Sequence, residues 1–103
     1  MQIWRIPASG GKEQALTSGH ERMRHPAYSP DGRWLYVQPS HRNIYRLPAD
    51  GGPLQAVTRF PDAGLFLEEP TVSPDGRSLV YCRSNGGSSL WRLTLDPGPE
   101  PAR

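Results

Sequence analysis

The pentapeptide SPDGR at residues 29–33 decides the fold, and it recurs unchanged at residues 73–77. Each copy lies between two short apolar segments. The serine can hydrogen-bond back to the turn, the proline presets φ at the second position, and the glycine accepts the positive φ of a type I turn that a bulge closes. The sequence therefore predicts two β-hairpins whose turns lie 44 residues apart.

A second signature, an apolar residue followed by an aromatic residue, arginine and another apolar residue, occurs three times. Its copies are IWRI at 3–6, IYRL at 44–47 and LWRL at 90–93. A Gly-Gly pair and a short segment that ends in threonine follow the first two copies, at 7–17 and 48–58. A period of about 40 to 45 residues with four short strands in each unit is typical of a propeller blade.

The paired glycines at 10–11 and 51–52 are expected to turn the third strand of a unit into the fourth, because such turns need a positive φ. A phosphate-binding loop is the alternative interpretation. It would require a following Lys-Ser or Lys-Thr pair and a helix, and the sequence has neither at these positions.

The apolar run WLYV at 34–37 does not alternate with polar residues, so both faces of this strand need to be covered. A blade stacked between two others provides that environment. We therefore expect units of four strands, A to D. The expected strands are C at 3–6 and D at 14–17, then A at 26–29, B at 34–38, C at 44–47 and D at 54–58, then A at 70–73, B at 78–83 and C at 90–93.

The order of SPDGR between two strands, then IYRLPADGG at 44–52 and a short strand that ends in threonine, resembles the WD40-like (PD40) repeat of TolB-type propellers. The resemblance covers nearly the whole chain and implies an all-β fold of antiparallel four-stranded blades. In that family the repeats occur in periplasmic TolB, in substrate-gating domains of prolyl-oligopeptidase-like peptidases, and in sensory regions of bacterial kinases and transcription regulators. The resemblance thus implies a periplasmic or other extracytoplasmic location, although the chain shows no signal peptide. The repeated residues are structural in all these proteins, so the resemblance leaves the function open.

The expected organisation is that of an incomplete propeller of about two blades. Residues 1–20 would supply the C and D strands of one blade, residues 24–60 a complete blade, residues 67–95 the A, B and C strands of the next, and residues 96–103 a proline-rich, truncated end. Closed propellers need about four to eight blades. We therefore expect either a fragment of a larger protein or a homo-oligomer. A trimer that completes a six-bladed ring, with the D strand of one copy paired to strand C of the next, is the expected assembly.

Charge and hydropathy exclude two classes of partner. The net charge is only +2, and Arg22, Arg24, His25 and Arg42 are the residues that could gather on one rim as a site for an anionic group. Nucleic-acid binding requires a dense basic stripe with stacking aromatic side chains, so no nucleic acid is expected as a partner. Membrane insertion is not expected either, because no apolar run approaches the roughly 20 residues of a membrane span.

Cysteine and histidine give no indication of a metal or a cofactor. Cys82 lies in an expected B strand, where the other copy has Gln38, and a single thiol cannot form an internal disulfide. We interpret it as a structural thiol. His20, His25 and His41 are expected in or beside loops, and no metal-ligand spacing connects them.

Two repeated or paired charged groups have a structural and a functional interpretation. The arginine of strand C, present as Arg5, Arg46 and Arg92, is expected to run its stem along the blade and to place its head at an edge or against an acidic loop residue. A ring of ligand-binding arginines is the alternative. Glu68 and Glu69 are expected in a long loop between strands D and A. Dipeptidyl-peptidase-type propellers use a Glu-Glu pair to hold the amino terminus of a substrate, which is the functional alternative here.

No catalytic residue is expected. Ser29 and Ser73 belong to turns, and the Gly-x-Ser-x-Gly motif of serine hydrolases is absent. The loops differ between copies while the repeated residues have structural roles, and exposed loops are where binding residues concentrate. We therefore expect a non-enzymatic module whose loop rim binds a protein or a peptide. The alternative is a substrate-gating propeller fragment of a prolyl-oligopeptidase-like serine peptidase.

Overall fold

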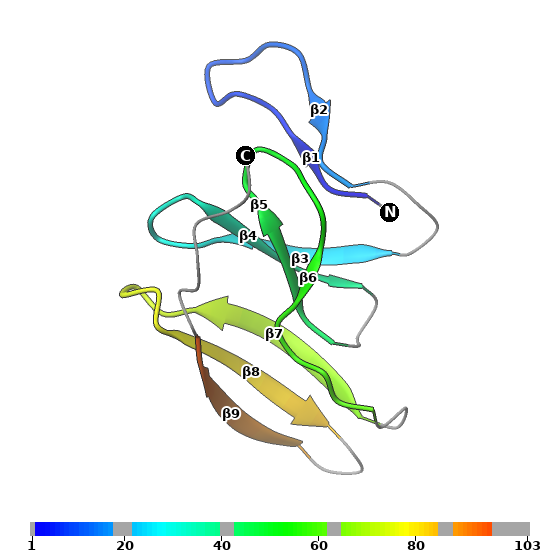
Figure 1. Ribbon diagram of the computed structural model, residues 1–103, viewed down its shortest axis with the longest axis vertical. Helices are drawn as coiled ribbons and strands as arrows, with labels where there is room; N and C mark the ends of the chain where they lie inside the picture. The colour runs from blue at the N-terminus through cyan, green and yellow to red at the C-terminus, as the bar shows by residue number, and fades with distance from the viewer. Residues whose placement is uncertain (1, 18–21, 40–42, 62–64, 85–87, 96–103) are drawn as a thin grey trace.

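The computed structural model describes residues 2–17, 22–39, 43–61, 65–84 and 88–95. These residues form three antiparallel sheets of two, four and three strands, in the orders β1-β2, β3-β4-β5-β6 and β7-β8-β9 (Figure 1). They contain no helix that could span a membrane. The strands are β1 (Trp4–Arg5), β2 (Gln14–Ala15), β3 (Met23–Tyr28), β4 (Trp34–Pro39), β5 (Tyr45–Pro48), β6 (Gln55–Ala56), β7 (Phe66–Val72), β8 (Ser78–Ser84) and β9 (Ser88–Thr94).

The predicted hairpin turns are confirmed in both copies. In the first, Ser29 Oγ donates to Asp31 Oδ1 at 2.6 Å and accepts from the Trp34 amide at 3.0 Å. The Gly32 amide donates to the Ser29 carbonyl at 2.9 Å, and Gly32 has φ 75°. The second turn has the same hydrogen bonds, and its glycine, Gly76, has φ 74°. The local chemistry of five residues therefore sets both A-to-B connections.

The two A strands begin earlier than predicted, and this is a correction. They start at Met23 in β3 and Phe66 in β7 rather than at positions 26 and 70. Each strand passes through a bulge at which a residue other than glycine has a positive φ, His25 at 53° and Glu69 at 52°. The bulge restores pairing with the B strand on its far side, so the segment remains part of the sheet.

The three sheets stack in chain order and enclose two apolar clusters. Trp34 and Tyr36 of β4 pack against the third sheet, where Leu79 lies. Leu35 and Val37, on the opposite face of the same strand, join the cluster that includes residues of the first sheet. All six residues of β4 are buried, which confirms the prediction that both of its faces are covered.

Polar groups connect strands and sheets at fixed positions. The Ile3 amide donates to Thr17 Oγ1, and the Ile44 amide donates to Thr58 Oγ1, each at 2.9 Å. The threonine that ends each D segment therefore holds the start of the C strand beside it. Gln38, which is fully buried at the end of β4, donates its side-chain amide to the Leu67 carbonyl of the third sheet.

The turn aspartates make the free energy of unfolding depend on pH in the acid range. The hydrogen bond from Ser29 Oγ, and after it the Arg33 amide, holds the pKa of Asp31 below its ordinary value of 3.8. Ser73 and Arg77 do the same for the pKa of Asp75. A carboxylate whose pKa is lower in the folded state than in the unfolded chain stabilises the folded state at pH values above the unfolded-state pKa. This contribution is lost as the pH falls through the folded-state pKa.

We predict that the double variant Asp31→Asn/Asp75→Asn loses less stability than the parent chain between about pH 5 and pH 2.5, because two groups that bind protons on unfolding are removed. The urea midpoint, measured across this range, is the test. Ser29→Ala/Ser73→Ala, which keeps both carboxylates but removes their hydroxyl donors, should also flatten the profile. Profiles that remain parallel in all three proteins would contradict the assignment.

Candidate functional site

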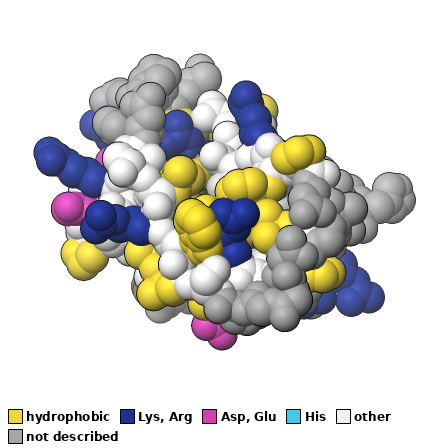
Figure 2. Space-filling model, turned by 90° about the horizontal axis from the view of Figure 1, so that it is seen from below, with side chains coloured by type: hydrophobic (Ala, Val, Ile, Leu, Met, Phe, Trp, Pro, Cys, Tyr) yellow, Lys and Arg dark blue, Asp and Glu magenta, His cyan; other side chains and the backbone are white. Residues whose placement is uncertain are grey.

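A cluster of two aromatic rings around an arginine stands out on the surface. The guanidinium carbon of Arg83 lies 4.3 Å from the ring centroid of Trp91 and 4.9 Å from that of Phe60. Arg83 belongs to the end of β8, Trp91 to β9, and Phe60 to the connection that follows β6. We call Phe60, Arg83 and Trp91 the rim cluster. Figure 2 views the molecule from the end at which β9 lies and shows hydrophobic side chains gathered around basic ones.

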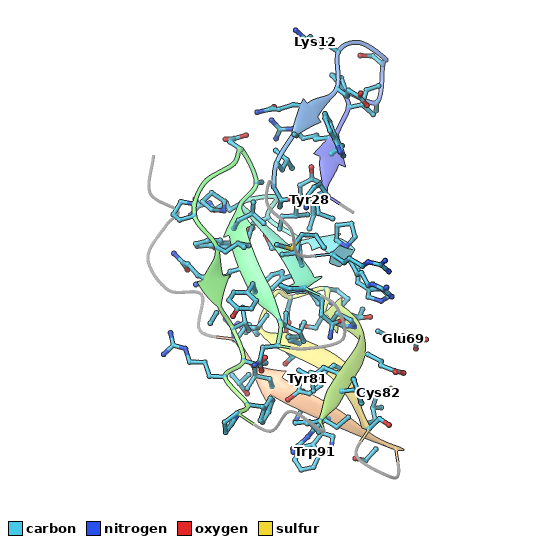
Figure 3. All side chains as sticks on the ribbon, turned by 90° about the vertical axis from the view of Figure 1, so that its right-hand side faces the viewer. Lys12, Tyr28, Glu69, Tyr81, Cys82 and Trp91 are labelled. Atoms are coloured by element: carbon cyan, nitrogen blue, oxygen red, sulfur yellow. The ribbon has the colours of Figure 1, made fainter. Side chains whose placement is uncertain are left out.

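The register of the β8–β9 hairpin brings two members of the rim cluster together. Tyr81 pairs with Trp91, and Arg83 pairs with Ser89, so Arg83 and Trp91 are diagonal neighbours on one face of the sheet. Tyr81 lies on the same face and is buried, whereas Trp91 is 46% exposed. Trp91 therefore sits where the buried face of the third sheet reaches solvent, at the lower margin in Figure 3.

Phe60 is held in place by Asn43, a residue just before β5. The Phe60 amide donates to Asn43 Oδ1 at 2.9 Å, and Asn43 Nδ2 donates to the Phe60 carbonyl at 3.0 Å. Thr58 Oγ1 donates to the same Asn43 oxygen at 2.8 Å. The backbone on which Phe60 stands is thus fixed by one side-chain amide, and its partly buried ring packs against the apolar cluster between the second and third sheets.

The electrostatics of the rim cluster combine a cation with apolar surroundings. Burial raises the pKa of Tyr81, and the nearby positive charge of Arg83 opposes that rise. Trp91 Nε1 donates to Ser89 Oγ at 2.7 Å, which fixes the indole on the strand. Tryptophan and arginine are among the side chains most enriched at binding hot spots. The arrangement suits an apolar or aromatic side chain that carries a carboxylate nearby.

Of the repeated arginines of strand C, Arg5 connects two sheets and has the predicted role. Arg5 donates to the Ala49 carbonyl at 2.8 Å and pairs with the Asp50 carboxylate at 3.3 Å, across to the acidic turn of the second sheet. Arg46 instead places its guanidinium carbon 3.9 Å from the ring centroid of Trp34. Arg92 is exposed on β9. The structure therefore gives two of the three arginines contacts within the protein.

The acidic pair lies in a strand and not in the predicted loop, because the bulge extends β7 toward its start. Glu68 and Glu69 are both exposed, and Glu69 points away from the body of the molecule (Figure 3). Arg24 and His25 take the corresponding positions on the neighbouring inner strand, β3. Both carboxylates thus lie on an exposed strand, and this position gives no support to an amino-terminus site.

The basic residues expected on one rim are only partly within the described chain. Arg24 and His25 line a shallow hollow of about 390 Å³ between β3 and the segment before β1, together with Ile3 and Met23. His25 belongs to β3, which corrects the expectation that it lies in or beside a loop. His20, His41 and Arg42 lie outside the described residues.

Cys82 is half-buried in β8, opposite Glu68 on one side and Leu90 on the other. Among the described residues, no group of three or more His, Cys, Asp or Glu side chains is arranged to hold a metal ion. The rim cluster was not predicted from the sequence, because Phe60, Arg83 and Trp91 share no motif. Trp91 is the one member of the cluster that belongs to a repeated motif, the C-strand signature, in which it occupies the position of Tyr45.

Comparison with a solved structure supports the fold. A solved structure described as "The structure of putative TolB from Agrobacterium tumefaciens" superposes with a TM-score of 0.79 and 27% identity, over 95% of this chain and 39% of that one. The uncharacterized protein Atu1656 of Agrobacterium fabrum is 34% identical over 77% of this chain, and the uncharacterized peptidase YuxL of Bacillus subtilis is 30% identical over 85%. The chain spans 27% and 14% of these two relatives. No protein-family model matches it. The chain thus has an all-β fold of TolB-like propeller blades.

We predict that Trp91→Ala costs about 1–2 kcal/mol of stability, because the indole is half-exposed and contributes one cation–π contact and one hydrogen bond to Ser89. Leu79→Ala, which empties a fully buried site in the core of the same sheet, should cost about 2–5 kcal/mol. Urea unfolding of both variants is the measurement. A loss for Trp91→Ala as large as that for Leu79→Ala would assign the tryptophan to the core instead of to a binding surface.

Proposed function

We propose that this chain is a non-enzymatic module of a larger propeller protein, built from WD40-like (PD40) repeats, and that it binds a protein or peptide partner through the rim cluster. The observation that carries the proposal is the half-exposed Trp91 stacked on Arg83 beside Phe60. The share of each relative that the chain covers supports the view that it is part of a longer propeller.

The position of the rim cluster supports binding over a purely structural role. Phe60 follows the D strand of one sheet, whereas Arg83 and Trp91 flank the B-to-C turn of the next sheet. Residues from two successive units therefore meet at one rim. Connecting segments carried by a rigid scaffold are the usual place for binding residues. The Asn43 amide supplies that rigidity by fixing the Phe60 backbone on both its donor and its acceptor side.

The chemistry of the cluster defines the class of partner. A guanidinium held against two rings is oriented for a carboxylate, and the exposed indole offers a flat apolar surface beside it. The matching ligand is a peptide segment with an aromatic or aliphatic side chain next to an acidic residue or a carboxyl terminus. Desolvation beside the rings strengthens the ionic part of such a contact.

We predict that selection of random linear peptides on the immobilised chain enriches sequences of this kind. Trp91→Ala and Arg83→Gln should each weaken binding of a selected peptide by about tenfold or more, because hot-spot side chains dominate interface energies. Fluorescence anisotropy of the labelled peptide provides the affinity. Tyr28→Ala removes a comparably exposed aromatic residue outside the cluster and should leave the affinity unchanged. Failure to enrich peptides, or equal effects of all three variants, would refute the proposal.

The similarity to the uncharacterized peptidase YuxL favours a second candidate, a substrate-gating propeller segment of a serine peptidase. Under the leading proposal, the purified chain hydrolyses none of a panel of peptide, ester and glycoside substrates. The coding sequence that follows codon 103 separates the two candidates. A Gly-x-Ser-x-Gly motif with later aspartate and histidine would favour the peptidase, whereas further SPDG repeats without it, or a stop codon, would favour the binding module.

A further inference from the structure

Each contact between successive sheets repeats the same pair of C-strand positions. Ile3, the first residue of the first signature, shares an apolar cluster with Leu47, the last residue of the second signature. Ile44 packs in the cluster that Leu93, the last residue of the third signature, covers. The first C-strand position of one sheet therefore meets the fourth C-strand position of the next sheet.

At each end of the stack of sheets in the described chain, one C-strand residue of this contact has no partner sheet to cover it. Leu90 corresponds to Ile3 and Ile44, which are 7% and 0% exposed, yet Leu90 is 72% exposed. Ile6 corresponds to Leu47, which is 1% exposed, yet Ile6 is 58% exposed. The first and third sheets lie at opposite ends of the molecule (Figure 1).

Neighbouring side chains extend both open positions into faces. Beside Leu90, the β-sheet register places Val80 and Cys82 on the same side of the third sheet, pointing away from the second. We call these three residues the third-sheet face. Beside Ile6 stands Trp4, which is 57% exposed, and these two residues form the first-sheet face.

We propose that the 103-residue chain associates head to tail with a second copy of itself, the third-sheet face of one copy covering the first-sheet face of the next. The two faces are the two halves of a contact that is already closed twice within each copy, so Leu90 takes the role of Ile44 and Ile6 takes the role of Leu47. A head-to-tail contact of this kind can close into a ring.

The repeats differ at one position of this contact. Gln38 on β4 is fully buried and donates to the carbonyl of Leu67, which belongs to the A strand of the third sheet. The third-sheet face has Cys82 at the corresponding position. Cysteine, a small side chain with a weak donor, needs no such partner when it is covered.

A polar contact can also be repeated across the copies. Arg5 of the first sheet donates to the carbonyl of Ala49 in the turn of the second sheet, at 2.8 Å. Arg92 is the equivalent arginine of the third sheet, and Ala8 is the equivalent turn residue of the first. Head-to-tail packing would bring Arg92 of one copy to the Ala8 carbonyl of the next.

Contact through the faces of the sheets is favoured over exchange of a strand. In the trimer expected from the sequence, β2 would have to complete the third sheet of another copy. In the structure, β2 is paired with β1 in its own sheet. The Ile3 amide also donates to Thr17 Oγ1 at the end of the same segment. Exchange would break these hydrogen bonds, whereas packing of the faces leaves them intact. Two copies then supply six stacked sheets, within the four to eight blades of closed propellers.

The test uses charge at each open face of the full 103-residue chain. Sedimentation velocity and native mass spectrometry should show the parent chain as a species of two or more copies at micromolar concentration. Leu90→Glu and Ile6→Glu should each be monomeric, because either charge blocks one half of the contact. An equimolar mixture of these two variants can make the contact only once and cannot close a ring, so it should form a heterodimer only at higher concentration than the parent assembly needs, and nothing larger. Leu54→Glu, which puts the same charge on an exposed leucine outside both faces, should assemble like the parent.

Cys82 provides a second readout, because it lies within the third-sheet face. Its alkylation by iodoacetamide should slow as the concentration of the parent chain rises, and Leu90→Glu should abolish this dependence. Circular dichroism of each variant establishes that it is folded. A parent chain that is monomeric with concentration-independent alkylation, an assembly that survives both charges, or a mixture that assembles as tightly as the parent would overturn the proposal.

Discussion

Strand β4 is covered on both of its faces, and this constraint orders the rest of the structure. Trp34 and Tyr36 require an apolar surface on one side, and Leu35 and Val37 require another on the opposite side. A sheet is one layer thick, so another layer must cover each of its faces, and in this structure both layers are sheets. The short Gly-Gly and SPDG turns keep consecutive strands within one sheet, and the sheets therefore stack in the order of the chain. The rim cluster exists because this stacking brings the end of one unit beside the middle of the next.

The parts of the fold that local chemistry determines could be predicted from the sequence. The turn after Ser29 needs only its own five residues, and its hydrogen bonds form as expected. The starts of the A strands could not be predicted, because a positive φ is uncommon for residues other than glycine and Glu69 has no preference for it. Pairing with β4 and β8 on both sides of the bulge imposes that conformation on His25 and Glu69. It is therefore a property of the assembled sheet, and the proline that follows each of them indicates extended backbone rather than a positive φ.

The candidate site could not be predicted from the sequence for a similar reason. Asn43, Phe60, Arg83 and Trp91 come from four separate segments, and none forms a motif with another. Repeat analysis assigns Trp91 the role of Tyr45, an aromatic residue between sheets. Its exposure depends on which segment lies opposite, and that is known only when the sheets are packed. Repetition thus predicts where a side chain stands in a blade, and only the packing of the blades shows whether solvent reaches it.

The open faces raise the question of how strong an association they could support. Burying a leucine-sized side chain contributes about 1.5–3 kcal/mol, so Leu90, Ile6 and Trp4 together offer on the order of 6 kcal/mol for one contact. The loss of translational and rotational freedom on association costs about 4–15 kcal/mol. One such contact between two copies is therefore marginal. A closed ring of two copies makes the contact twice for a single loss of freedom, so closure decides whether the assembly is stable. The same arithmetic favours a covalently linked blade, which covers the face without that loss, wherever the chain is part of a longer propeller.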